Sequence, residues 1–68
     1  DSYVDKMLMH FKEADRFYEF KKADLKDYSC YRNILEQFKK FYNLNSFNLK
    51  QIDKYLWQVG KKSFPRKY

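Results

Sequence analysis

The sequence FNLKQI, residues 47–52, is the clearest helix start in this chain. Asn48 can accept a hydrogen bond from the backbone N–H three residues later, and Gln51 can return one to the backbone of Asn48, which makes a capping box. Phe47 stands before the cap, where it can pack on Ile52 as a hydrophobic staple. We therefore predict a helix that begins at Leu49.

Downstream of this cap, apolar residues recur at helical spacing as far as Val59. The predicted buried stripe consists of Leu49, Ile52, Tyr55, Leu56 and Val59. Gly60 follows, where a left-handed C-terminal cap is expected, and Pro65 disfavours further helix. The sequence thus predicts a helix over 49–59 and an irregular basic tail over 61–68.

Upstream, a second helix is predicted over about 28–42, and Asn43 can end it in the left-handed conformation. Its predicted apolar stripe is Tyr28, Tyr31, Ile34, Leu35, Phe38, Phe41 and Tyr42, with charged residues opposite. The six-residue connection from Asn43 to Asn48 contains no glycine. A DNA-binding helix-turn-helix has a turn of about three or four residues, often with glycine, so this connection fits it only loosely.

A first helix is predicted over about 2–22, because one stripe gathers Tyr3, Val4, Met7, Leu8, Phe11, Ala14 and Tyr18. Met9, Phe17 and Phe20 fall outside that stripe and form a second apolar patch. A second apolar face predicts a partner surface, against another domain of a parent protein or a second copy of the chain. The alternative is that a third helix of the same bundle covers this patch.

The composition sets the fold class. A chain of 68 residues has room for one domain, and one Gly and one Pro leave few helix breaks. The single Cys excludes an internal disulfide, so the 22% of aromatic residues must build the core. We predict an all-α, small three-helix bundle over residues 1–60, and the start at Asp1 suggests an excerpt of a longer protein. No stretch approaches the ~18 apolar residues of a membrane span, so we expect a cytoplasmic chain.

Catalysis is not indicated. His10 and Cys30 are each unique, metal-ligand spacings are absent, and a lone glycine cannot form a phosphate-binding loop. The sequence predicts no catalytic residue, no metal and no cofactor. The alternative is that these residues form the terminal domain of an enzyme whose active site lies elsewhere.

Positive charge gathers in the second half of the chain. Residues 1–37 carry seven Lys and Arg against eight Asp and Glu, whereas residues 38–68 carry eight against Asp53 alone. A basic surface with aromatic residues is typical of contact with nucleic acid. The predicted binding residues are Lys50, Lys54, Trp57, Lys61, Lys62, Arg66 and Lys67.

We expect this binding to be weak and independent of sequence, because twelve Lys stand against three Arg and Arg is the commonest reader of guanine. The alternative for Trp57 is packing against Phe64 and Pro65 of the tail or against the second apolar face of the first helix. The rival function is a structural or oligomerising module that packs through Met9, Phe17 and Phe20. Salt separates the two hypotheses, since apolar packing depends on it much less than phosphate binding does.

Overall fold

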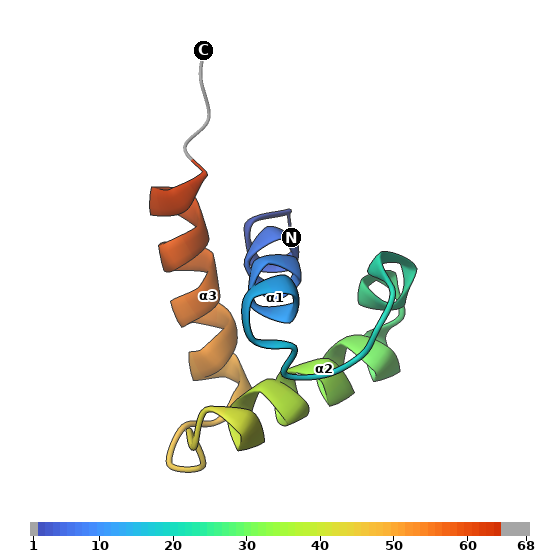
Figure 1. Cartoon of the computed structure of the whole chain (residues 1–68). Helices are drawn as coiled ribbons and strands as arrows, with labels where there is room; N and C mark the ends of the chain where they lie inside the picture. The colour runs from blue at the N-terminus through green and yellow to red at the C-terminus, as the bar shows by residue number, and fades with distance from the viewer. Residues whose placement is uncertain (1, 65–68) are drawn as a thin grey trace.

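The structure, a computed structural model, describes residues 2–64 and is an all-α bundle of three helices (Figure 1). The helices are α1 (Ser2–Asp15), α2 (Tyr28–Phe41) and α3 (Leu49–Ser63), and a short 3-10 helix, η1 (Lys22–Lys26), precedes α2. In Figure 1, α3 stands beside α1, and α2 passes beneath both. The predicted fold class is confirmed, and the residues described contain no strand.

The first helix is shorter than predicted. It ends at Asp15, because Arg16 adopts a left-handed conformation with φ 50° while its N–H still bonds to the Lys12 carbonyl at 2.9 Å. The Lys12 ammonium donates to the Phe20 carbonyl and lies 5.0 Å from the centre of the Phe20 ring. Lys12 thus holds the reversed chain against α1, and the prediction of a helix to Lys22 was wrong.

This reversal of the chain also decides where the residues of the predicted partner surface lie. Phe17 and Phe20 are buried in the core, and Met9 is half-buried against it. The Phe17 ring meets the Phe38 ring edge-on at 5.3 Å. The prediction that Met9, Phe17 and Phe20 share a second face of one helix was therefore wrong, since two of the three lie beyond the end of α1 and pack inside their own chain.

The connection between α2 and α3 follows the local sequence. Asn43 has φ 58°, as predicted for the end of the second helix. Asn48 Oδ1 accepts from the Gln51 N–H at 2.8 Å, and Gln51 Oε1 accepts from the Asn48 N–H at 2.9 Å. The predicted capping box is confirmed, and α3 begins at Leu49.

Asn48→Ala is expected to lower the free energy of unfolding by about 1 kcal/mol, because it removes one side of this capping box. Urea unfolding followed by circular dichroism measures the change. The control is Asn45→Ala, an exposed asparagine in the same connection for which no side-chain hydrogen bond is recorded. Equal stability of the two variants would contradict a capping role for Asn48.

Gly60 does not end the third helix. The helix continues to Ser63, Gly60 has no positive φ, and the Phe64 N–H closes the last turn on the Gly60 carbonyl at 2.8 Å. Gly60 is buried where α3 crosses α1: a Cβ added there would lie 2.7 Å from the Tyr3 carbonyl oxygen. The prediction of an irregular chain beyond Gly60 was thus wrong for residues 61–63, because the glycine serves a close helix crossing.

Candidate nucleic-acid interface on α3

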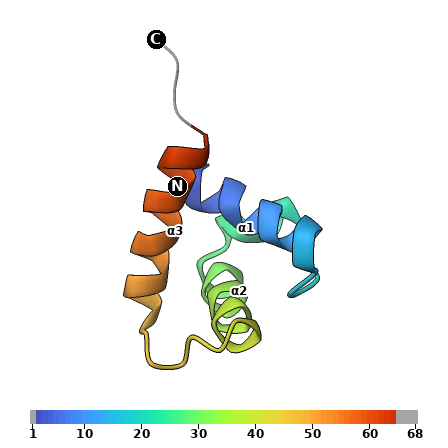
Figure 2. The same ribbon diagram turned by 60° about the vertical axis from the view of Figure 1, so that its left-hand side comes forward.

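The candidate interface is one face of α3. At about 100° per residue, Lys50, Lys54, Trp57 and Lys61 fall on a single line along the helix, which we call the lysine stripe. The three lysines are exposed, and the first and last lie roughly 16 Å apart along the axis at about 1.5 Å per residue. Figure 2 shows α3 at one edge of the bundle, with α1 crossing it near its C-terminal end.

The charge of the stripe is not neutralised by nearby carboxylates. Within residues 2–64 the recorded ion pair joins Lys12 to Glu19 at 3.7 Å, and no lysine of α3 takes part in one. Lys50 and Lys54 stand four residues apart on the helix, a spacing at which like charges destabilise it by a few tenths of a kcal/mol. A polyanion would relieve this repulsion.

Asp53, the acidic residue of α3, faces the bundle. Its carboxylate accepts a hydrogen bond from the Tyr31 hydroxyl of α2. Burial, followed by this bond and the charge of Asp53, raises the pKa of Tyr31 above its usual value, so the hydroxyl remains a donor at neutral pH. The carboxylate of Asp53 is therefore hydrogen-bonded to α2, although helical spacing places Asp53 within about 60° of Lys50 on α3.

Trp57 is half-buried at the border between the stripe and α1. Its ring meets the Tyr3 ring edge-on, with the centres 5.8 Å apart, and the Lys61 ammonium lies 5.1 Å from the indole centre. The Tyr3 contact places Trp57 against α1, but on its main apolar stripe and not on the second face that the alternative prediction named. Phe64 instead lies beside Lys6, 5.6 Å from its ammonium, so it is in contact with α1. Part of the indole thus belongs to the helix crossing.

Three predicted binding residues remain, Lys62, Arg66 and Lys67. Lys62 is exposed, and together with Lys61 and Trp57 it lines a shallow hollow on the C-terminal half of α3. Arg66 and Lys67 lie outside the described residues. The structure thus brings four lysines and Trp57 onto one helix, whereas the sequence predicted that Lys61 and Lys62 lie in the irregular tail.

Three aromatic residues that the sequence assigned to buried stripes are exposed: Tyr28, Phe41 and Tyr55. Tyr55 lies with Phe47 along an apolar groove near the start of α3. The sequence signal for this groove is the run of aromatic residues around the connection between α2 and α3.

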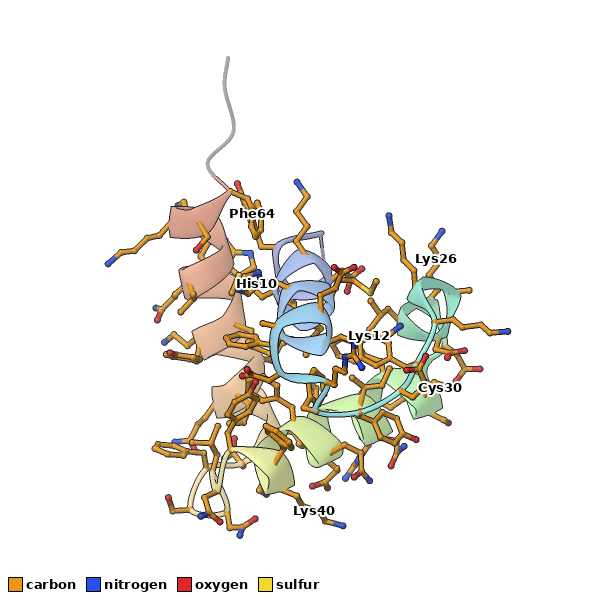
Figure 3. All side chains as sticks on the ribbon, viewed as in Figure 1. His10, Lys12, Lys26, Cys30, Lys40 and Phe64 are labelled. Atoms are coloured by element: carbon orange, nitrogen blue, oxygen red, sulfur yellow. The ribbon has the colours of Figure 1, made fainter. Side chains whose placement is uncertain are left out.

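His10 and Cys30 are not brought together. Figure 3 shows them on opposite sides of α1, with Cys30 at the start of α2 near η1. Desolvation, followed by the carboxylates of Asp27 and Asp24, raises the pKa of the Cys30 thiol, which lowers its nucleophilic thiolate fraction. Among residues 2–64, no group of three or more His, Cys, Asp or Glu side chains could hold a metal ion.

Fold and surface together define a small three-helix unit with a basic helix on its edge. Over 66 residues the chain is 42% identical to an uncharacterized protein of Haemophilus influenzae, a match that covers 97% of this chain and 30% of that protein. The chain thus spans about a third of the length of this relative. No family model and no solved structure matches. In the part of the chain described, none of the helices has the length and apolar character needed to cross a membrane.

Proposed function

We propose that this chain is a non-catalytic helical module that binds the phosphate backbone of nucleic acids through the lysine stripe. The observation that carries the proposal is that Lys50, Lys54 and Lys61 are exposed on one face of α3 and form no ion pair with a carboxylate within residues 2–64. Lysine ammoniums bind phosphates as point charges, and each contact releases a counterion from the nucleic acid.

The same geometry favours binding without sequence preference. The stripe contains no arginine, the side chain that reads guanine in two hydrogen bonds. Trp57 is held by Tyr3 and Lys61, so base stacking would use only its outer surface. Binding of this kind suits an accessory domain of a larger cytoplasmic protein, and the greater length of the Haemophilus influenzae relative is consistent with that role.

Replacing Lys50, Lys54 and Lys61 together by Gln is expected to weaken binding to single-stranded and duplex oligonucleotides alike. Loss of three phosphate contacts should weaken binding at least about tenfold at low salt and reduce the slope of log affinity against log salt by about 2–3. Fluorescence anisotropy of labelled oligonucleotides of about 20 nucleotides, titrated from about 50 to 200 mM salt, measures both quantities.

The matched control replaces Lys22, Lys26 and Lys40 by Gln, which removes the same charge elsewhere. Lys26 and Lys40 project away from α3 in Figure 3. Trp57 is the single tryptophan, so its fluorescence reports directly on the stripe. An equal loss of affinity in the control, or no binding at low salt by the parent chain, would exclude the stripe as the binding surface.

A further inference from the structure

A second surface lies at the corner between α2 and α3. There an apolar groove of about 530 Å³ is bounded by three helices and the connection between the last two. The residues that line this corner groove are Phe11, Phe38, Tyr42, Leu44, Phe47, Gln51, Ile52 and Tyr55. None of them belongs to the lysine stripe, although Tyr55 also lines the hollow beside Trp57, Lys61 and Lys62.

Large aromatic side chains remain exposed along the groove. Tyr55 is 54% exposed and Phe47 is 45% exposed. Phe41, also exposed, extends this surface, since its ring centre lies 4.9 Å from that of Tyr42. Continuous apolar surface of this kind marks a binding site more often than a free monomer surface.

The shape of the groove suits a helix. Gln51 and Tyr55 stand one turn apart on α3, and Phe11 of α1 and Leu44 of the connection also contribute to the lining. An amphipathic helix binds such a surface with apolar side chains spaced three, four and seven residues apart.

The charges around the groove select the partner. Lys39 stands three residues before Tyr42, and Lys62 lies on the same face of α3 as Tyr55, with which it lines a second hollow. Among residues 38–64 the one acidic side chain, Asp53, is engaged with Tyr31. The groove is thus apolar within, and lysines of α2 and α3 stand beside it.

One carboxylate lies at the α1 edge of the groove. Asp15 accepts a hydrogen bond from the Tyr42 hydroxyl at 2.5 Å. Burial, then this bond and the charge of Asp15, raises the pKa of Tyr42 to about 12, so the hydroxyl stays protonated at neutral pH. Asp15 therefore has a partner within the chain, whereas the lysines beside the groove form no ion pair with any of residues 2–64.

We infer that the corner groove binds an amphipathic helical segment of another polypeptide whose apolar face is bordered by Asp and Glu. A second copy of this chain fits less well, because its net charge of +6 would bring like charges together. A nucleic acid would gain no phosphate contact from the apolar lining. The inference does not depend on the proposed function of the lysine stripe.

Two designed peptides of about 15 residues test the inference. Both peptides have Leu and Phe at the same positions, at helical spacing. At every remaining exposed position one peptide, the Glu peptide, has Glu, and the other, the Lys peptide, has Lys. Titration of ¹⁵N-labelled chain, followed by NMR, should show the Glu peptide shifting the amides of Leu44, Phe47 and Tyr55. We expect the Lys peptide to bind at least about tenfold more weakly.

A pair of exposed tyrosines supplies the matched variants. Tyr55→Ser should lower the affinity for the Glu peptide about tenfold, as expected for the loss of an aromatic anchor. Tyr28→Ser, at a position 75% exposed at the start of α2, should leave the affinity for the Glu peptide unchanged. Both positions are exposed, so both variants should fold, which thermal melts check.

Several outcomes would overturn the inference. Equal affinity for the two peptides would show that the groove does not select an acidic partner. An unchanged affinity of the Tyr55→Ser chain for the Glu peptide would show that the peptide does not bind in the groove. Peptide shifts confined to Lys50, Lys54 and Lys61 would show simple ion pairing. Shifts of groove amides on raising the chain concentration without peptide would assign the groove to a second copy.

Discussion

Phe38→Ala is expected to leave most of the chain unfolded at room temperature. Phe38 is 2% exposed, and its ring centre lies 5.2 Å from that of Phe11, 5.3 Å from Phe17 and 4.6 Å from Tyr42. These rings come from α1, from the reversal after it and from the end of α2. Removing a buried Phe costs about 3–5 kcal/mol, which equals the whole stability that a domain of this size usually has.

Far-ultraviolet circular dichroism measures the effect over a urea titration. We expect the variant to have lost most of its helical signal already in the absence of urea. Phe41→Ala is the matched control: it makes the same chemical change one turn later in α2, at a side chain that is 52% exposed. That variant should lose less than about 1 kcal/mol. A Phe38→Ala chain as stable as the Phe41→Ala chain would mean that the aromatic cluster does not hold the fold.

The parts of the fold that local sequence controls were predictable. The start of α3 depends on Asn48 and Gln51, which lie three residues apart and bond to each other. The end of α2 depends on Asn43, which tolerates the left-handed conformation. In each case the residues that decide the structure are close in the sequence, so one sequence window contains the whole interaction.

The end of α1 was not predictable in this way. Residues 16–22 have no strong helix breaker, and the chain turns there because Phe17 and Phe20 are buried. Phe17 packs on Phe38, a partner far along the sequence. Tertiary burial thus overrides helix propensity, and a periodicity measured along one helix cannot reveal it.

The same limit applies to the two surfaces. Helical periodicity correctly placed Lys50, Lys54 and Trp57 on one face, because that relation is internal to α3, whereas Lys61 was predicted to lie in the irregular tail. The corner groove was missed, since periodicity says which side chains share a face and not how far a neighbouring helix covers that face. Tyr55 shares the apolar side of α3, yet it lies on the open surface of the groove.

Gly60→Ala is expected to destabilise the chain even though alanine is the better helix former. In an exposed helix interior this change would stabilise by about 1 kcal/mol. Here the new Cβ would lie 2.7 Å from the Tyr3 carbonyl oxygen, 3.0 Å from Tyr3 Cβ and 3.1 Å from Met7 Cγ. The first of these atoms belongs to the backbone of α1, which cannot rotate away as a side chain can.

Relief of this clash requires α1 and α3 to move apart, which loosens the packing at their crossing. Overpacking of this kind costs about 1–3 kcal/mol, and the melting temperature should fall by roughly 5–20 °C. Gln58→Ala, at an exposed position of α3, is the control and should stay within about 0.5 kcal/mol of the parent. Helix propensity and steric overlap change the stability in opposite directions at residue 60, so the direction of the change distinguishes them. A Gly60→Ala chain that melts at a higher temperature than the parent would show that α1 does not approach α3 so closely. Gly60 would then not be required for the packing of the two helices.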